Sequence, residues 1–378
     1  MKKILIIIGT RPEAIKMAPV VAELKKNPRF FEVRICVTGQ HREMLDQVLK
    51  FFDIMPDYDL NLMKFSQDLT DITQGVLIGV RDILRSWVPD KILVHGDTTT
   101  AFSASLAGFY EKISVAHIEA GLRTDNIFSP WPEEMNRRLV SVIASQHFAP
   151  TKQAKKNLLR EGKAENSIFV TGNTVVDALL DAVAKIQESS VLQTTFHDLF
   201  PFLDEKLKLI LVTGHRRENF GEGFEQLCLA LKTLSERDDV QILYPVHPNP
   251  KVQEPVYKML GECPRIHLVE PQDYLPFVYL MKRSFMIITD SGGIQEEAPT
   301  LGKPVIVTRD TTERPEALVA GTVILVGTNT ENIVRETELL LDNPAAYDQM
   351  SGAYNPYGDG QAAERIIKIL SNDMQGNT

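Results

Sequence analysis

Cysteine is scarce in this chain, and the few cysteines stand far apart. Cys36, Cys228 and Cys263 are the only three among 378 residues. An odd number of widely spaced cysteines excludes a disulfide framework and lacks the paired spacing of a structural zinc site. Free thiols suit a reducing compartment, so we expect a cytoplasmic protein without a cysteine zinc site.

Long apolar runs are also missing, and no stretch is long enough to span a bilayer. The first eight residues, MKKILIII, begin like a signal peptide. Their apolar run is short, however, and it leads into residues 9–13 (GTRPE) without a small-residue cleavage site. We therefore interpret these residues as a first buried strand and expect no membrane partner.

The chain also has no excess of positive charge. The net charge is −9, which argues against a general nucleic-acid surface, although a local basic pocket for a phosphorylated ligand remains compatible with it. The chain also lacks the G-x-G-x-x-G fingerprint of dinucleotide binding. We expect neither a nucleic-acid partner nor a nicotinamide cofactor.

Alternating strands and helices dominate what is present. Strand candidates are Ile4–Ile8, Val33–Val37, Lys91–Val94, Ile113–His117, Leu209–Thr213, Gln241–Val246, Ile266–Val269, Phe285–Thr289 and Val305–Val307. Helix candidates in the first half are Ala14–Lys26, Arg42–Phe52, Thr99–Tyr110 and Glu133–Ser145. This alternation predicts an α/β protein with doubly wound parallel sheets, in which ligands lie beyond the carboxyl ends of the strands.

The length suggests two or three domains. We place a boundary near Gly172–Asn173, which gives an N-terminal domain of residues 1–172 and a C-terminal domain of residues 173–360. Periodicity alone lets the last helix candidate, Gly360–Leu370, belong to either half. The segment Gln187–Glu205 is weakly patterned and is not a clear linker.

A Ser-Gly-Gly turn in the second half organises the functional prediction. The apolar run Phe285–Thr289 is followed by Asp290 and by the turn Ser291–Gly293, after which a short helix, Ile294–Leu301, is expected. A strand, a glycine turn and a helix N-terminus direct free backbone N–H groups and a helix dipole toward one place. The pattern predicts an anion site, with a simple tight turn as the alternative.

Charged residues beside this turn extend the candidate site. Glu297 lies one turn inside the short helix, where its carboxylate can accept hydrogen bonds from vicinal hydroxyls such as those of a ribose. Arg314 follows the next strand and adds positive charge. His215 and two arginines follow the strand Leu209–Thr213, and such a group can bind a pyrophosphate or protonate a leaving phosphate. The alternative is a polar loop held by Glu218.

Two further pairs of residues are binding candidates. Arg11 and Lys16 flank the start of a helix directly after the first strand, where they can contact an anion or a sugar. Gln272 and Phe277 lie in the sequence PQDYLPF, where they can pair with and stack on a base. The alternatives are surface charge for the first pair and a core position for Phe277.

Three carboxylates fall at the ends of strands or the start of a helix in the first half. Asp97 follows one strand, Glu119 follows the next, and Glu133 begins a helix. Taken singly, Asp97 is a good helix cap and Glu133 compensates a helix dipole. Together they can raise one another's pKa and serve as acids and bases. Arg137, four residues after Glu133, can pair with it, and His117 shares a strand face with Glu119.

Ten motifs over nearly the whole chain carry a resemblance. In order they are GTRPEAIKMAP, GQHREMLDQVL, HGDTTT, HIEAGLR, SPWPEEMNR, GNTVVDAL, GHRRENFG, DSGGIQEEAP, DTTERPEA and NPYGDG. This set resembles the bacterial UDP-N-acetylglucosamine 2-epimerases of the non-hydrolysing kind. The resemblance implies two Rossmann-like domains facing a cleft, the GT-B arrangement. It also implies that residues 361–378 cross back to the first domain and that the protein is a homodimer.

The resemblance implies a reaction as well. UDP-N-acetylglucosamine would lose UDP to give enzyme-bound 2-acetamidoglucal, and UDP would re-add to give UDP-N-acetylmannosamine for surface polysaccharide synthesis, without a cofactor or a metal. Carried over by motif, the candidate catalytic residues are Asp97, Glu119, Glu133, Arg137 and His215. The candidate substrate-binding residues are Arg11, Lys16, Gln272, Phe277, Ser291, Gly292, Gly293, Glu297 and Arg314.

Three other readings stay open. A hydrolysing relative would release UDP and free N-acetylmannosamine, a glycosyltransferase would share the fold, and a nucleotide-sugar sensor would bind without turnover. Some relatives also bind a second substrate molecule as an activator. Positions that could serve such an activator here include Gln40, Glu134, Arg216 and His247. Glu43 and Ser66 depart from the pattern of Gram-positive relatives, which argues against activation.

Overall fold

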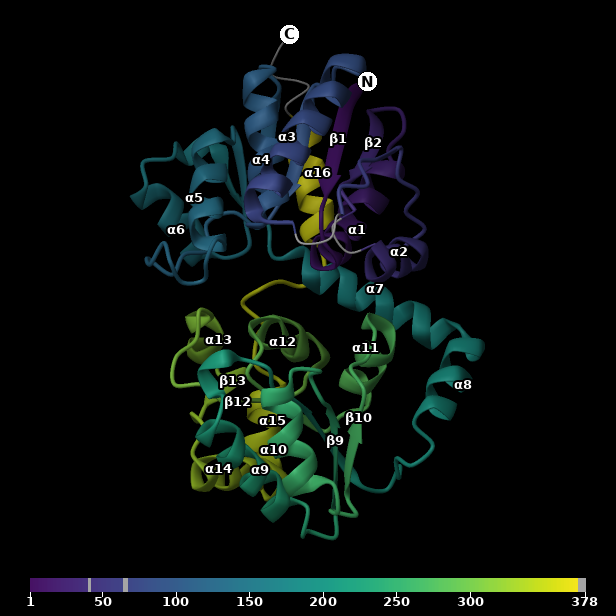
Figure 1. The fold of residues 1–378 in the computed structure, drawn as a ribbon, viewed down its shortest axis with the longest axis vertical. Coiled ribbons are helices and arrows are strands. Elements are labelled where there is room, and N and C mark those ends of the chain that lie inside the picture. The colour runs from purple at the N-terminus through teal and green to yellow at the C-terminus, as the bar shows by residue number, and fades with distance from the viewer. Residues whose placement is uncertain (40–41, 64–66, 373–378) are drawn as a thin grey trace. The chain divides into compact units, whose positions relative to one another are not determined.

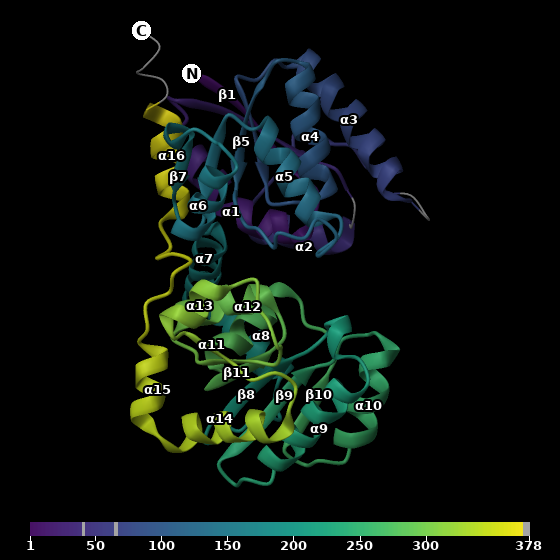
Figure 2. The ribbon, with the colours of Figure 1, turned by 90° about the vertical axis from the view of Figure 1, so that its left-hand side faces the viewer.

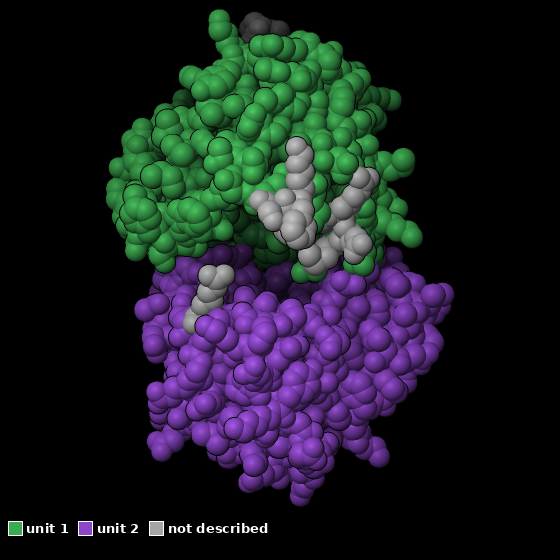
Figure 3. Space-filling view, viewed as in Figure 1, with its two compact units in different colours: residues 1–178, 357–378 green, residues 179–356 purple. Residues whose placement is uncertain are grey.

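The computed structural model describes residues 1–39, 42–63 and 67–372, and Figure 1 shows its ribbon. Gln40, Ser66 and the side chain of Glu43 lie outside the described part. Two compact units divide the chain (Figure 3): residues 1–178 with 357–378 form unit 1, and residues 179–356 form unit 2. Within the described ranges, no helix combines the length and the apolar character that crossing a bilayer requires.

Unit 1 is built on a parallel sheet of seven strands in the order β3-β2-β1-β4-β5-β6-β7. Its strands are β1 (Lys2–Ile8), β2 (Phe31–Val37), β3 (Tyr58–Asp59), β4 (Lys91–His95), β5 (Ser114–Ile118), β6 (Gln146–Ala149) and β7 (Ile168–Val170). Its helices are α1 (Arg11–Lys25), α2 (Arg42–Phe51), α3 (Leu69–Ser86), α4 (Thr99–Tyr110), α5 (Glu133–Ile143), α6 (Lys152–Arg160), η1 (Glu165–Ser167) and α16 (Ala362–Asn372). Helix α7 (Thr174–Glu188) begins in this unit and ends in unit 2.

Helices cover both faces of this sheet, which explains why its strands are continuous apolar runs. Helices α3, α4 and α5 pack in one layer, and α16 packs against α1 on the other side of the sheet (Figure 2). Every side chain of Ile4–Ile8 is buried as a result. The carboxylate of Asp177 accepts a 2.8 Å hydrogen bond from the backbone N–H of Ala363, which fastens the start of α16 to α7.

Unit 2 contains a parallel sheet of six strands in the order β10-β9-β8-β11-β12-β13. Its strands are β8 (Lys208–Thr213), β9 (Val240–Pro245), β10 (Ile266–Val269), β11 (Met286–Thr289), β12 (Val305–Val307) and β13 (Val323–Leu325). Its helices are α8 (Ser190–Leu199), η2 (Arg217–Asn219), α9 (Glu222–Leu234), α10 (Pro250–Leu260), α11 (Tyr274–Arg283), α12 (Gly292–Glu297), η3 (Ala298–Leu301), α13 (Pro315–Ala320), α14 (Thr330–Asp342) and α15 (Pro344–Ser351).

One large apolar core supports the second sheet. Helix α9 packs between α10 and α14, and these helices close over inward residues of β8, β9 and β11 such as Ile210, Ile242 and Ile288. The predicted fold class, two Rossmann-like doubly wound parallel-sheet domains of the GT-B type, is confirmed. Both sheets reverse their strand order beside the first strand of the unit, so their carboxyl ends are where ligands are expected.

Several elements were missing from the sequence prediction. Strand β6 has the sequence Gln-His-Phe-Ala and is fully buried. Its two polar residues interrupt the apolar run by which a buried strand is recognised. Helix α3 contains Gly75 and Gly79, which weaken a helical pattern. Its start is nevertheless a capping box between Asp68 and Asp71. The weakly patterned segment Gln187–Glu205 is largely helical, because α7 runs to Glu188 and α8 follows it.

Candidate active site

Asp97 lies just after β4, at the carboxyl edge of the first sheet, and pairs with a cation. Nη2 of Arg137 on α5 is 2.5 Å from Oδ2 of Asp97. The side-chain amide of Asn136 donates a 3.0 Å hydrogen bond to the backbone carbonyl of the same aspartate. Two consecutive residues of α5 therefore hold the loop between β4 and α4, in which Thr98 caps α4.

The partner of Arg137 differs from the one predicted by helix spacing. Glu133 and Arg137 are four residues apart, but Arg137 directs its guanidinium to Asp97 and to Oε2 of Glu134, which is 3.4 Å away. Glu134 is fully buried and also accepts hydrogen bonds from the backbone N–H of Thr124 and from Arg138. The expected pair with Glu133 is therefore wrong. Glu133 itself begins α5 and is half-buried.

Glu119 lies one strand over from Asp97 and is held in an unusual backbone conformation. Its φ is +62°, a left-handed value that non-glycine residues seldom adopt. Its Oε2 is 2.5 Å from Nζ of Lys16 and accepts a 2.7 Å hydrogen bond from Asn173. The predicted binding residue Lys16 and the predicted catalytic residue Glu119 are therefore brought into direct contact. Arg11, the other predicted cation, is the first residue of α1 and is half-buried.

Two histidines beside Glu119 are buried. Nε2 of His95 is 3.9 Å from Oε2 of Glu119, and burial lowers the pKa of His95 to about 4. His117 was expected to share a strand face with Glu119. Strand β5 ends at Ile118, however, and the positive φ of Glu119 breaks the alternation. Nε2 of His117 instead lies 2.7 Å from the carbonyl oxygen of Gly96.

Glu13 is a buried acid at the same sheet edge that the sequence prediction missed. It is 2% exposed and completes a capping box with Thr10 at the start of α1. Its Oε2 accepts backbone hydrogen bonds from Gly9 at 3.0 Å and Thr10 at 2.7 Å. Burial outweighs these bonds and raises the pKa of Glu13 to about 7. The spacing Thr-Arg-Pro-Glu was the signal that could have found it.

In unit 2, Asp290 connects the ends of two neighbouring strands. It follows β11 and is fully buried. Its Oδ2 accepts backbone hydrogen bonds of 2.8 Å from both His215 and Arg216, which follow β8. The predicted catalytic residue His215 therefore lies at the carboxyl edge of the second sheet. Burial lowers its pKa, and the negative charge of Asp290 opposes that effect.

Two guanidinium groups gather at the Ser-Gly-Gly turn. An idealised Cβ on Gly292 would lie 3.7 Å from Cζ of Arg314 and 3.8 Å from Nη2 of Arg216. Arg314 forms an ion pair with the buried carboxylate of Glu296 on α12. Ser291 directly precedes α12 without a capping hydrogen bond from its side chain, and its N–H donates a 2.9 Å hydrogen bond to the hydroxyl of Thr289. This arrangement of cations and a helix start is suited to an anion.

The remaining predicted binding residues of unit 2 lie on nearby segments. Glu297 ends α12, and its Oε2 would be 3.8 Å from a Cβ placed on Gly293. Gln272 precedes α11 and donates a 2.6 Å hydrogen bond to the carbonyl of Glu270. Phe277 lies within α11 and is half-buried. Their contacts with a base or a ribose stay predictions.

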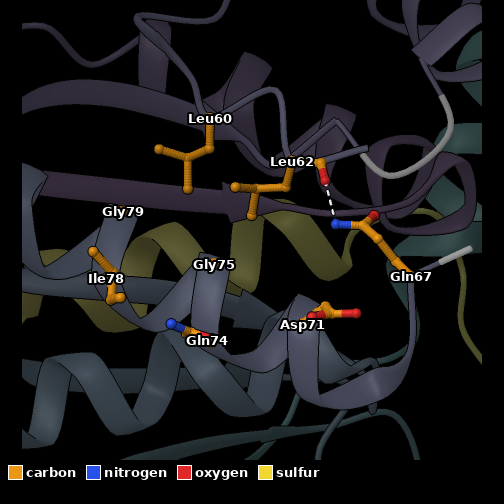
Figure 4. A pocket seen from close by; sticks show the side chains of 8 residues that line it. All are labelled: Leu60, Leu62, Gln67, Asp71, Gln74, Gly75, Ile78 and Gly79. Carbon is orange, nitrogen blue, oxygen red and sulfur yellow. Dashed lines mark hydrogen bonds between the residues drawn. The ribbon is translucent and has the colours of Figure 1, made fainter. Parts of the chain in front are cut away.

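A groove of about 450 Å³ lies elsewhere on unit 1 (Figure 4). It is lined by Leu60, Leu62, Gln67, Asp71, Gln74, Gly75, Ile78 and Gly79. A Cβ on Gly79 would lie 2.7 Å from Cδ1 of Leu60, so the Leu60 side chain can pack here only because residue 79 has no side chain. None of the predicted site residues lines the groove. Within the described ranges, no three His, Cys, Asp or Glu side chains are grouped so that they can hold a metal ion.

Comparison with known proteins agrees with the resemblance. The family described as UDP-N-acetylglucosamine 2-epimerase matches residues 22–371. The chain belongs to this family. The UDP-N-acetylglucosamine 2-epimerase of Escherichia coli O157:H7 is 57% identical over 372 residues, which cover 98% of this chain and 99% of that protein.

Two solved structures of the family extend the likeness to the fold. The Neisseria meningitidis UDP-GlcNAc 2-epimerase bound to UDP-GlcNAc has a TM-score of 0.90 and 51% identity, covering 98% of this chain and all (100%) of that one. The Methanocaldococcus jannaschii UDP-GlcNAc 2-epimerase in complex with UDP-GlcNAc and UDP has a TM-score of 0.81 and 36% identity, covering 98% of this chain and 99% of that one. As a member of the UDP-N-acetylglucosamine 2-epimerase family, the protein is an enzyme.

Proposed function

We propose that the protein interconverts UDP-N-acetylglucosamine and UDP-N-acetylmannosamine by inverting C2 of the sugar without releasing it. Inversion at carbon requires that a proton leave one face and that another arrive on the opposite face, so two acid–base groups are needed. The observation that carries the proposal is the pair of carboxylates Asp97 and Glu119. They follow neighbouring strands at one sheet edge, and each contacts its own cation, Arg137 or Lys16.

The reaction proceeds by elimination and re-addition. A carboxylate takes the C2 proton, and the C–H electron pair forms a C1–C2 double bond. The C1–O bond breaks, and its electron pair passes to the β-phosphate oxygen of UDP. The intermediate is 2-acetamidoglucal. UDP then attacks C1 again while a proton arrives at C2 on the other face, and the reaction is redox-neutral throughout.

Asp97, Glu119 and Glu133 are the groups that exchange the C2 proton. Arg137 keeps Asp97 in place through the 2.5 Å contact, and Lys16 does the same for Glu119. Each of these two carboxylates therefore has a cationic partner that fixes its position. Arg11 contributes a further positive charge at the start of α1.

Unit 2 supplies the groups for the nucleotide. Arg216, Arg314 and the start of α12 bind the diphosphate through Ser291, Gly292 and Gly293. His215 donates a hydrogen bond to the phosphate oxygen that takes up the electron pair of the broken bond. Glu297 accepts hydrogen bonds from the ribose, while Gln272 and Phe277 contact the uracil. Support comes from the guanidinium groups beside Gly292 and from the similar Neisseria meningitidis epimerase, which is bound to UDP-GlcNAc.

The enzyme is expected to work in the cytoplasm, as a homodimer, in the synthesis of a polysaccharide. The three cysteines are free thiols, which suits a reducing cytoplasm. The product would feed the synthesis of a surface polysaccharide. A homodimer is expected from the resemblance, and light scattering of the purified protein measures its mass.

Proton NMR of the enzyme with UDP-N-acetylglucosamine in deuterated water tests the proposal. We expect UDP-N-acetylmannosamine that carries deuterium at C2. Free N-acetylmannosamine together with UDP would instead indicate the hydrolysing reaction. Binding with an unchanged substrate spectrum would contradict the proposal and favour a nucleotide-sugar sensor or a transferase.

A further inference from the structure

Asp290 is a buried acid of unit 2 whose two carboxylate oxygens have different surroundings. Its side chain has no exposed surface, and a buried carboxylate requires hydrogen-bond partners. Oδ2 accepts two backbone hydrogen bonds of 2.8 Å, from the N–H groups of His215 and Arg216. Nδ2 of Asn219 is 3.5 Å from the same oxygen. One carboxylate oxygen therefore fastens the loop after β8 to the end of β11.

The other oxygen of Asp290 faces the ring of His215. Oδ1 is 3.3 Å from Nδ1 of the imidazole. Within the described ranges, this oxygen has no hydrogen-bonded partner. The ring nitrogen of His215 lies close enough that a small rotation of the ring would let it donate to this oxygen. Because Nδ1 and Nε2 lie on opposite sides of an imidazole, a proton on Nδ1 leaves Nε2 directed away from Asp290. The His215 side chain is 43% exposed, so its outer part is accessible.

We propose that Asp290 is a positioning residue that holds His215 with its proton on Nδ1 and thereby presents Nε2 to the departing phosphate of the nucleotide sugar. This inference rests on the proposed function. When the imidazole is protonated, its Nε2–H donates to the phosphate oxygen, and Asp290 stabilises the resulting charge. When the ring is neutral and keeps the same orientation, it accepts a proton at Nε2 and becomes the imidazolium again.

Charged groups from the surrounding elements also act on His215. Its ring stacks on that of His247, which follows β9, with 5.8 Å between the ring centres. Burial and the nearby charges of Arg216 and Arg309 lower the pKa of His215, while the negative charge of Asp290 raises it. Arg309 forms ion pairs with Glu218 and Glu313. Removing the charge of Asp290 therefore lowers the pKa of His215 further and reduces the fraction of imidazolium at a given pH.

Asp290→Asn is the test substitution, because an amide keeps the size of the side chain. Its oxygen can still accept the backbone N–H groups of His215 and Arg216, while its NH₂ donates to Nδ1 and moves the ring proton to Nε2. We expect kcat to fall by about 10²-fold, the range of a general acid–base contribution, with the Kd for UDP unchanged. The alkaline limb of the kcat/KM profile, along which the imidazolium of His215 loses its proton, should move to lower pH.

Asp239→Asn is the matched control. It makes the same chemical change in the same unit, on a carboxylate whose side chain is 44% exposed and pairs with Arg237 before β9. Its kcat and pH profile should equal those of the wild type. Equal losses of kcat and of UDP affinity in Asp290→Asn would mean that Asp290 only maintains the loop, which would overturn the inference.

Nitrogen NMR of His215 in the wild-type enzyme gives a second readout that needs no substitution. We expect the neutral ring to carry its proton on Nδ1, and a proton on Nε2 would refute the inference even if Asp290→Asn failed to fold. The two proposals fail differently. If the wild type does not epimerise its substrate, the proposed function is wrong, whereas an epimerising wild type with an unaffected Asp290→Asn variant contradicts the positioning role alone.

Discussion

The hydroxyl of Thr98 donates a 2.7 Å hydrogen bond to Oε1 of Glu13. This bond joins the loop after β4, which carries Asp97, to the loop after β1, whose Gly9 and Thr10 amides bind the other oxygen of Glu13. A single buried carboxylate therefore connects two loops of the candidate site. The connection is internal to unit 1.

Glu13→Gln should change how stability depends on pH. The pKa of Glu13 is about 7 in the folded protein against 4.5 for the free side chain. Because the folded pKa is the higher one, the wild type is stabilised by protonation at low pH and loses that stability as pH rises from about 4.5 to 7. Glutamine does not titrate. Over this pH range, the free energy of unfolding of the variant should therefore rise relative to that of the wild type, by on the order of 2–3 kcal/mol.

Urea unfolding of both proteins at pH 5 and pH 8 measures this effect. The free-energy difference between variant and wild type should be more favourable to the variant at pH 8. A difference independent of pH would show that Glu13 is ionised throughout. The constant part of the difference reports the hydrogen bonds that an amide cannot reproduce.

Three buried histidines in adjacent strands should make unit 1 sensitive to acid. Burial lowers the pKa of His95 to about 4, that of His117 to about 3 and that of His147 to about 4, from 6.5. The unfolded chain therefore binds more protons than the folded one below pH 6.5. Stability should fall as pH falls from about 6.5 toward 4, and each histidine contributes up to about 1.4 kcal/mol for every tenfold rise in proton concentration.

His147→Asn tests this account, because His147 is 1% exposed. The free energy of unfolding of the variant should fall less steeply between pH 6.5 and pH 4.5 than that of the wild type. His197→Asn is the matched control on an exposed histidine of α8, and it should leave the slope unchanged. Parallel slopes for the wild type and His147→Asn would contradict the prediction.

Arg137→Ala should impair catalysis far more than Arg138→Ala. Arg137 contacts Asp97 and the buried Glu134, whereas Arg138 contacts Glu134 and the exposed Asp125. We expect kcat to fall by about 10²-fold or more for Arg137→Ala, because Asp97 loses its cation. For Arg138→Ala the loss should stay within about threefold.

A discontinuous assay of UDP-N-acetylmannosamine formation gives kcat and KM for both variants, and circular dichroism confirms that they are folded. Equal effects at the two positions would mean that Asp97 needs no cationic partner. Arg137→Lys restores a charge but lacks the guanidinium fork, so only partial recovery of kcat is expected.

Glu296→Gln should weaken nucleotide binding through Arg314. Glu296 is 1% exposed and forms an ion pair with Arg314, whose guanidinium lies beside Gly292. Without the negative charge of Glu296, the guanidinium of Arg314 is no longer held in one orientation. The Kd for UDP should rise by about 10-fold, which corresponds to about 1.4 kcal/mol.

Isothermal titration with UDP measures this change. Glu331→Gln, an exposed acid in the first turn of α14, is the matched control and should bind UDP like the wild type. An unchanged Kd for Glu296→Gln would show that Arg314 is positioned by other contacts or does not meet the nucleotide.

Much of the architecture was predictable, because buried parallel strands are short apolar runs and helices begin at recognisable caps. Helix Thr99–Tyr110 and strands Ile266–Val269 and Val305–Val307 were predicted with their observed limits. Each has local signals that agree with its final surroundings. Strand β6 was missed because Gln146 and His147 are polar, and only the neighbouring strands and helices make their burial possible.

The sequence alone determined the type of fold and which side chains follow the ends of strands, because alternation of apolar runs and helices leaves few topologies. Only the tertiary structure decided which charges meet. Helix spacing favoured Glu133 as the partner of Arg137, yet the sheet edge brings Asp97 within 2.5 Å of it. Likewise, Lys16 meets Glu119 although 103 residues separate them. Such pairs depend on long-range packing, which local patterns do not encode.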